Sequence, residues 1–276
     1  MATGQLTRSG RVPLRLRGTP VFLYHGLTSS LVPDCPLRER RYWVAPSQFL
    51  KHLDCASAEG RRVALLSELW DSENVLTREN PLTALTFDDG HISNYEIAFP
   101  LLIGAGVRAE FFVNTANIGT KGFLSWQQVT EMQRAGMSFQ SHSHDHVDLV
   151  RLRPWEKQRQ LKHSKQTLED RLGRKVEFLA VPFGRLCAEI SRIAIETGYR
   201  SVCTSRSWPA RPGARLLNRV VVYGHTSQNG FRKLLLGNPV SYAIRAVRAA
   251  ALSLPKHLHS RLAEPQEPVT GLENSA

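Results

Sequence analysis

Two adjacent carboxylates follow one of the apolar runs of this 276-residue chain. Asp88 and Asp89 come directly after residues 83–87 (TALTF), and Gly90 follows them. Adjacent side chains at the end of a strand point in different directions, so one carboxylate can bind a cation while the other accepts a proton. Repulsion between the two disfavours ionisation of both unless a cation lies nearby. The alternative is a polar turn, because Asp and Gly are common in turns.

A group of histidines follows a later apolar run, residues 137–140 (MSFQ). Three of the ten histidines lie within five residues, at His142, His144 and His146. The spacing of His142 and His146 lets two imidazoles converge on one ion, and imidazole with carboxylate suits zinc or a similar metal. Two His and one Asp leave positions open for water and substrate, which is typical of a catalytic site. The alternative is a polar loop of exposed histidines.

Short runs of strand-forming residues alternate with longer helical patterns, which predicts an α/β fold with a parallel sheet, open or closed into a barrel. Strands are expected at 20–24, 63–66, 83–87, 109–113, 137–140, 176–181, 200–204 and 219–223, and helices near 46–58, 93–104, 125–135, 154–172 and 187–197. In such folds the chemistry lies at the carboxyl ends of the strands. His25, Asp88, His142 and Pro182 each follow a predicted strand closely.

The chain carries many more basic than acidic residues. The net charge is +12, and residues 1–20 carry four Arg and no acidic residue. A basic surface suits anionic lipids or glycans as well as nucleic acid. The chain has no run of about 20 apolar residues, and its start lacks the apolar core of a signal peptide. We therefore expect a cytoplasmic protein with peripheral contact to an anionic membrane. Residues 241–254 predict an Ala-rich helix that packs on the domain or, alternatively, lies on a membrane surface.

The motifs T-F-D-D-G (residues 86–90) and H-S-x-x-H (residues 142–146) occur in the order found in polysaccharide deacetylases with a nodulation-protein-B homology domain. The chain resembles this family, carbohydrate esterase family 4, over roughly residues 20–223. The resemblance implies a distorted (β/α)7-type barrel as a single catalytic domain with a helical C-terminal extension. We place a basic tail at 1–17, the catalytic domain at 18–232, and a C-terminal helix and disordered tail at 233–276.

The resemblance also implies roles for individual residues. Asp88 matches the catalytic base of the family, and Asp89, His142 and His146 match its metal ligands. His144 falls at a variable position and is expected to be a bystander.

The third family signature is R-x-P-[FY], and here it lacks the Arg. Pro182 and Phe183 are present, and together with the early pair Tyr24–His25 they resemble the branch that deacetylates poly-β-1,6-N-acetylglucosamine. The resemblance assigns oxyanion stabilisation to the backbone N–H of Phe183, whose ring would wall the pocket. It assigns the general acid to His25, with His225 as the alternative.

The resulting hypothesis is a metal-dependent hydrolase that removes N-acetyl groups from an amino-sugar polymer or its lipid-linked precursor. A metal-activated water would attack, with an Asp base and a His acid. Zn²⁺ is the expected ion, and Co²⁺, Ni²⁺ and Fe²⁺ are alternatives. The alternatives in function are an O-acetyl esterase or other amide hydrolase on the same scaffold, and a non-catalytic binder of glycans or nucleic acid. Because the base and all three ligands are present, we expect an N-acetylated glycan as substrate and no nucleic-acid partner.

Overall fold

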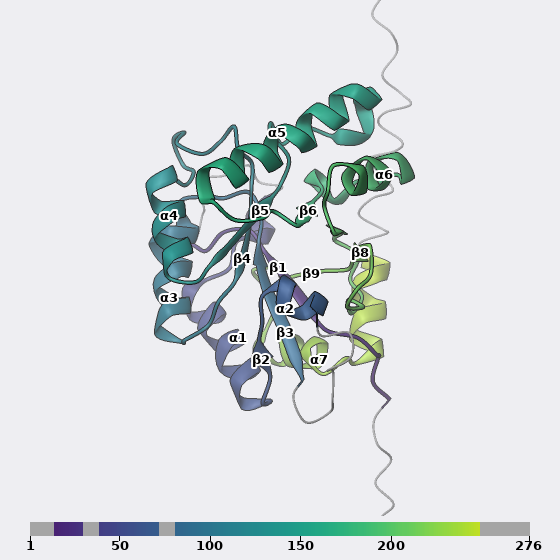
Figure 1. The fold of residues 1–276 in the computed structure, drawn as a ribbon. Helices are drawn as coiled ribbons and strands as arrows, with labels where there is room; N and C mark the ends of the chain where they lie inside the picture. The colour runs from purple at the N-terminus through teal and green to yellow at the C-terminus, as the bar shows by residue number, and fades with distance from the viewer. Residues whose placement is uncertain (1–13, 30–38, 72–80, 249–276) are drawn as a thin grey trace, which may run out of the picture.

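The structure is a computed structural model that describes residues 14–29, 39–71 and 81–248. Its centre is a nine-stranded parallel sheet in the order β8-β7-β6-β5-β4-β3-β1-β9, with β2 paired to β3 outside this path. The strands are β1 (Val21–Tyr24), β2 (Arg62–Val63), β3 (Leu82–Phe87), β4 (Glu110–Val113), β5 (Ser138–Ser141), β6 (Phe178–Ala180), β7 (Ser201–Cys203), β8 (Leu216–Leu217) and β9 (Val220–Val221). The sheet curls into a half-barrel with helices around it (Figure 1), which confirms the predicted barrel-type α/β fold.

A ladder of aromatic rings fixes the register of the central strands. Tyr24, Phe87, Phe111 and Phe139 are register partners on β1, β3, β4 and β5. Their successive ring centroids lie 5.3, 5.0 and 5.5 Å apart, and all four side chains are buried. Because a slip of one residue would turn these rings to the other face, the ladder holds the strands in register. It therefore aligns the residues that follow each strand.

The labelled helices around the sheet are α1 (Pro46–Ala58), α2 (Leu66–Asp71), α3 (Phe99–Gly104), α4 (Trp126–Arg134), α5 (Pro154–Leu172), α6 (Ala188–Glu196) and α7 (Gln228–Leu235). The five predicted helices are found, and α3 continues the π-helical turn η2 (Asn94–Ala98). Ser125 caps α4 with a capping box, and Gly173 ends α5 in the left-handed conformation at φ 60°. Local capping chemistry therefore sets these boundaries.

The prediction of a strand over 63–66 is wrong beyond Val63, because β2 ends at Val63 and Leu66 begins α2. Leu66 and Leu69 are buried there, so helical packing determines the conformation of this segment. The sequence reasoning also missed β8 and α7, both short elements whose apolar residues become buried only in the tertiary fold.

The C-terminal part of the described chain packs on the sheet. The predicted division after residue 232 falls inside α7, which packs against α1. A further helix runs from residue 239 to the end of the described chain at 248, while residues 249–254 of the predicted helix lie outside it. Tyr242 on this helix is buried, and Arg245 donates to the Val221 carbonyl. Among the described residues, no helix has both the length and the apolar character needed to cross a bilayer.

Candidate active site

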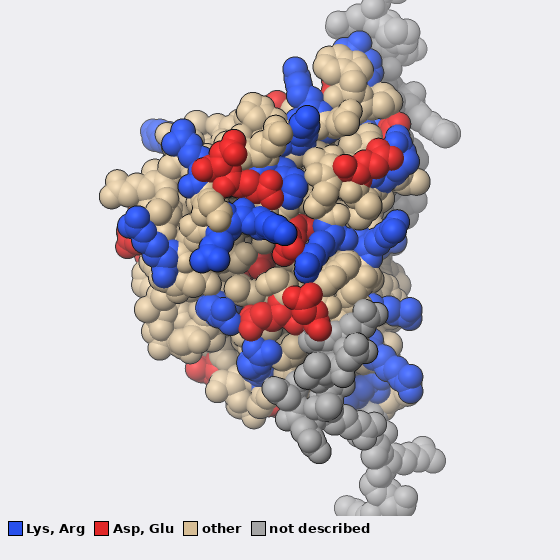
Figure 2. Space-filling view, viewed as in Figure 1, with Lys and Arg blue, Asp and Glu red and all other residues tan. Residues whose placement is uncertain are grey.

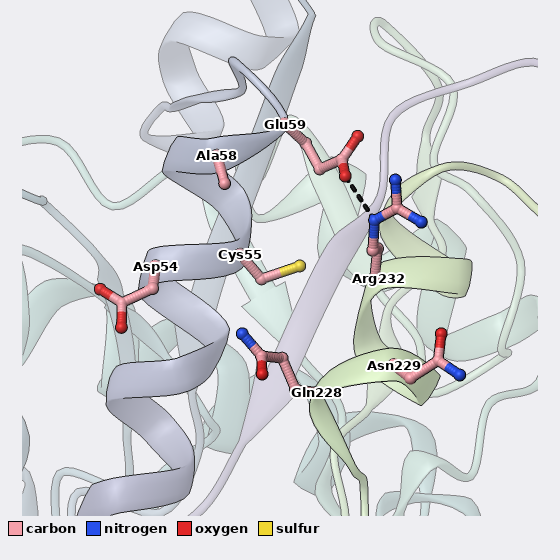
Figure 3. A pocket seen from close by; sticks show the side chains of 7 residues that line it. All are labelled: Asp54, Cys55, Ala58, Glu59, Gln228, Asn229 and Arg232. Atoms are coloured by element: carbon pink, nitrogen blue, oxygen red, sulfur yellow. Dashed lines mark hydrogen bonds and ion pairs between the residues drawn. The ribbon is translucent and has the colours of Figure 1, made fainter.

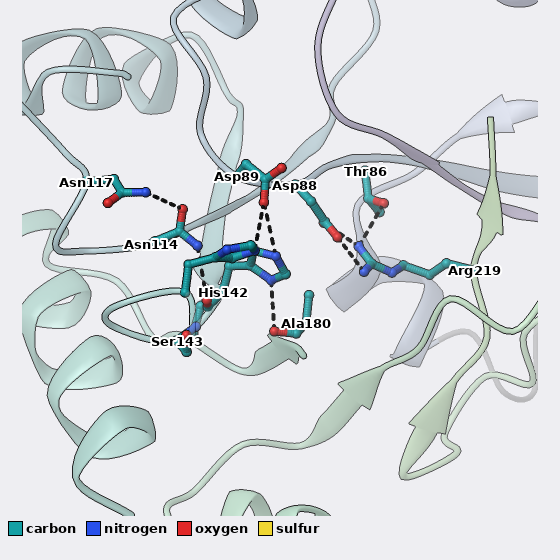
Figure 4. A network of polar contacts seen from close by, with 11 residues as sticks. Thr86, Asp88, Asp89, Asn114, Asn117, His142, Ser143, Ala180 and Arg219 are labelled. Carbon is teal, nitrogen blue, oxygen red and sulfur yellow. Dashed lines mark hydrogen bonds and ion pairs between the residues drawn. The ribbon is translucent and has the colours of Figure 1, made fainter. Parts of the chain in front are cut away.

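Asp89, His142 and His146 converge at the carboxyl edge of the sheet, just after β3 and β5. Figure 4 shows Asp89 facing His142, with Asp88 and Arg219 beside them. The Asp89 Oδ1 atom lies 3.3 Å from His142 Nε2 and 3.2 Å from His146 Nε2. One ligand atom from each residue lies within 4.8 Å of the others, and no further group of this kind exists in the described part of the chain. The His142 side chain is 3% exposed and that of His146 28% exposed, so the group opens to solvent on one side.

The surroundings of His142 suit a metal ligand. Its Nδ1 lies 2.9 Å from the Ala180 carbonyl oxygen, which can only accept, so Nδ1 carries a proton. In the neutral imidazole this leaves Nε2 with a free lone pair directed at Asp89, the arrangement that orients metal-binding histidines. Asn114 fixes the same segment by donating to the His142 carbonyl at 3.2 Å. The donor set therefore fits a divalent cation.

The electrostatics of the site favour a cation at the same place. Burial alone would raise the pKa of Asp89, but the close contacts of its carboxylate with the imidazoles of His142 and His146 outweigh burial and hold that pKa well below its usual value. Burial likewise opposes the charged form of His142, yet the carboxylates of Asp88 and Asp89 raise its pKa. The group thus concentrates negative charge that needs positive charge beside it.

Asp88 has a different partner, the buried guanidinium of Arg219. Two parallel hydrogen bonds join them, from Nη1 to Oδ1 at 2.7 Å and from Nη2 to Oδ2 at 2.8 Å. Arg219 also donates to Thr86 Oγ1 and lies over the ring of Phe112. Asp88 is 4% exposed and Arg219 1% exposed, so the pair is almost completely desolvated. A bidentate pair of this kind fixes the orientation of the carboxylate.

Sequence reasoning missed Arg219. The guanidinium lies 131 residues from Asp88 in the sequence. Arg219 follows β8, whereas the third family signature would carry its Arg at position 180, the last residue of β6. The signal available was the missing Arg of that signature, which left a buried carboxylate without a cation.

Among the residues that the structure describes, left-handed backbone at non-glycine positions is found at this site. In the described residues, the non-glycine positions with positive φ are Asp89 (75°), Ser143 (66°), His146 (53°) and Phe183 (59°). Such conformations cost about 1–3 kcal/mol each and persist where the surrounding structure enforces them. Gly90 follows at φ +70°, and a Cβ there would lie 2.9 Å from Val113 Cγ1. The D-D-G sequence is therefore a turn that also presents two carboxylates.

His25 follows β1 beside the two aspartates, and its Nδ1 is buried without a partner. Burial lowers the pKa of His25, while Asp89 and Asp88 act in the opposite direction. Its ring lies 4.7 Å from that of Tyr42. His225 is exposed, and its ring stacks on that of Tyr223 instead. Partial burial and the nearby charges of Arg245 and Arg248 lower the pKa of His225. Of the two candidate acids, His25 is therefore the one at the carboxyl edge of the central strands.

Pro182 and Phe183 follow β6 in the short turn η4 (Pro182–Gly184). The Phe183 ring is 59% exposed, and its centroid lies 4.8 Å from that of His146. The turn is closed by Gly184 N–H, which donates to the Val181 carbonyl at 3.0 Å. His144, the expected bystander, faces away from the three ligands, against Thr115 Oγ1 at 2.7 Å and the ring of His163 at 4.1 Å.

Away from these residues, a hollow of about 370 Å³ lies between α1 and α7 (Figure 3). Its lining includes the buried thiol of Cys55, and Arg232 there donates to Glu59. These charged groups satisfy one another and include none of the residues at the carboxyl edge. The hollow is therefore separate from the candidate active site.

Comparison with known proteins identifies the kind of domain that this chain carries. Residues 76–202 match the sequence profile described as polysaccharide deacetylase. The chain therefore carries a polysaccharide deacetylase domain over these residues, which is a hydrolase domain.

Individual relatives extend the match over most of the chain. YxkH of Bacillus subtilis strain 168, which is named as a polysaccharide deacetylase, is 28% identical over 218 residues, covering 77% of this chain and 74% of its own. The Streptococcus pyogenes deacetylase PplD, solved in complex with acetate, is 27% identical with a TM-score of 0.71 over 82% of this chain and 100% of its own. IcaB from Ammonifex degensii is 27% identical with a TM-score of 0.67 over 87% and 99%.

Proposed function

We propose that this protein uses a divalent cation to hydrolyse N-acetyl groups on an amino-sugar polymer or its lipid-linked precursor. The observation that carries the proposal is the contrast between two adjacent carboxylates. Asp89 shares one oxygen with two imidazoles at 3.2 and 3.3 Å, whereas Asp88 is held by Arg219. This arrangement supplies one ligand carboxylate and one separate base.

Asp89, His142 and His146 would hold the cation, and Zn²⁺ suits this donor set, with Co²⁺, Ni²⁺ and Fe²⁺ as alternatives. When bound, such an ion polarises the acetamide carbonyl and makes water a better nucleophile near neutral pH. The carboxylate of Asp88 accepts a proton from the attacking water. Arg219 orients Asp88 and stabilises its anionic form until that transfer.

Two further groups complete the reaction. The Phe183 N–H donates to the oxyanion of the tetrahedral intermediate, which is supported by the place of Phe183 in the turn after β6, beside His146. His25 donates a proton to the departing sugar amine, supported by its position after β1 beside Asp88 and Asp89. The products are acetate and a free amino sugar.

The test is acetate release by Zn²⁺-loaded protein from β-1,4- and β-1,6-linked N-acetylglucosamine oligomers and from O-acetylated xylan. We expect acetate from an oligomer and none from xylan. Asp89→Ala should lose both bound metal and activity, whereas the matched control His144→Ala, in the same loop, should keep both. Acetate from xylan alone would favour the O-acetyl esterase, and full activity in metal-free Asp89→Ala would contradict the metal-dependent reaction.

A further inference from the structure

The final third of the chain carries mainly basic charged residues. No Asp or Glu occurs between Glu196 and Glu264, whereas Lys and Arg recur throughout that interval. The chain also has no acidic residue before Asp34. Regions of the fold built from these two segments therefore carry positive charge without internal compensation.

The structure brings these segments together on one side of the molecule. Leu16 N–H donates to the Gly237 carbonyl at 2.8 Å, and Thr19 pairs with Ala210. Trp208 stacks on Tyr242 with their ring centroids 6.3 Å apart. The segment before β1, the loop between β7 and β8, and the helix from residue 239 thus form a continuous surface.

Five arginines on this surface are exposed and form no ion pair with any described residue: Arg17, Arg206, Arg211, Arg215 and Arg248. We call them the basic edge. Blue side chains line the right-hand side of the molecule in Figure 2, beside β8 and the yellow-green helix of Figure 1. Exposed arginines elsewhere lie on segments that also carry acidic residues, and some pair with them, as in Arg192–Glu196 and Arg153–Glu156. The basic edge therefore differs from the other exposed arginines in lying on segments that carry no acidic residue.

Apolar side chains lie among these charges. Val240, Ile244 and Val247 are 63%, 48% and 68% exposed, and their spacing places them on one face of the helix that begins at 239. The opposite face holds buried Tyr242. Trp208 is 40% exposed and lines a hollow of about 420 Å³ together with Arg17 and Arg211.

We propose that the basic edge and the outer face of this helix dock on a bilayer that contains anionic lipids. Arginine heads can bind lipid phosphates while Trp208 and the aliphatic stripe enter the interface between head groups and acyl chains. Charge complementarity selects an anionic bilayer over a neutral one. Nucleic acid would satisfy the arginines, but it leaves the aliphatic stripe without a role.

The test is co-sedimentation of the full chain with vesicles of phosphatidylcholine alone or mixed with phosphatidylglycerol. The protein should bind the mixed vesicles at low salt, bind the neutral vesicles weakly, and be released as salt rises. Arg211→Glu with Arg215→Glu should weaken binding at least about tenfold. Ile244→Ser with Val247→Ser should weaken it several-fold and leave the salt dependence unchanged.

The matched control is Arg134→Glu with Lys162→Glu, two exposed positions on α4 and α5 with the same change in charge. This control should bind as the wild type does, and circular dichroism should show all variants folded. Equal binding by the Arg211/Arg215 variant and the control would overturn the proposal. So would tighter binding to a DNA duplex, or a dimer that buries the helix and ignores vesicles. The readout requires no turnover, so it stands apart from the outcome of the deacetylase test.

Discussion

Two regions of the same sheet bury a carboxylate in opposite ways. At the carboxyl end of β3, Asp88 is neutralised by two hydrogen bonds from Arg219. At the amino end of β4, Glu110 is 1% exposed, one of its oxygens accepts from Leu66 N–H, and the other has no partner. Burial raises the pKa of Glu110 to about 7.

The different surroundings of Asp88 and Glu110 explain how the fold can keep a buried carboxylate ionised for the proposed chemistry. A buried carboxylate without a cation is stabilised in its neutral form, as Glu110 shows. The active site needs two ionised carboxylates side by side, so each requires its own positive charge. Arg219 supplies one for Asp88, and the proposed metal ion supplies the other for Asp89.

The largest effect should come from removing the base. Asp88→Asn keeps the shape of the side chain but cannot accept the proton from water. We expect acetate release to fall by about a thousandfold or more, within the range for loss of a general base. Steady-state kinetics on an N-acetylated oligomer measure this, and activity within tenfold of the wild type would remove Asp88 from the mechanism.

Breaking the pair from the other side tests the electrostatic comparison. Arg219→Gln leaves Asp88 buried without a cation, which should cost about 3–5 kcal/mol of unfolding free energy. Urea unfolding of the two single variants and the double variant Asp88→Asn/Arg219→Gln forms a thermodynamic cycle. The double variant should be more stable than Arg219→Gln alone. Additive effects would mean that the pair is energetically uncoupled.

At the other end of the sheet, Glu110→Gln should change how stability depends on pH. The pKa of Glu110 is about 7 in the folded protein against an ordinary 4.5, so the folded state keeps a proton that the unfolded state releases. The wild type should therefore lose about 3 kcal/mol as pH rises from 4.5 through 7, and the variant should not. The measurement is the stability difference between the two proteins at pH 5 and pH 8, and a constant difference would contradict the raised pKa.

The smallest effect should come from a change remote from both carboxylates. Ser125→Ala removes the side-chain acceptor that caps α4 through Gln128 N–H. It should lower stability by about 1 kcal/mol and leave kcat/KM unchanged. Thermal unfolding beside the kinetic assay would separate loss of stability from loss of chemistry. A parallel fall in kcat/KM would mean that activity simply follows stability.

Much of the site could be predicted because its parts are local in sequence. Asp88 and Asp89 are neighbours, and His142 and His146 are four residues apart, so strand-end placement brought them together. The helices with strong end signals, such as α5 between Pro154 and Gly173, were found at their observed limits.

The rest depends on contacts that no local pattern encodes. Arg219 meets Asp88 across 131 residues, and it does so only when the sheet curls so that Arg219 reaches the end of β3. The segment after Val63 forms α2 because Leu66 and Leu69 are buried in the tertiary core as part of a helix. This packing overrides the strand-like local sequence. Docking of the basic edge likewise rests on a surface assembled from three distant segments.

The most direct test of the central claim is a calorimetric titration of metal-free protein with Zn²⁺. The wild type should bind one ion per chain, and Asp88→Asn should bind it with affinity within a few-fold. Asp89→Asn should lose about a hundredfold or more in affinity, because it removes one of three protein ligands. Equal Zn²⁺ affinity in the two variants would contradict the division of labour between the adjacent carboxylates.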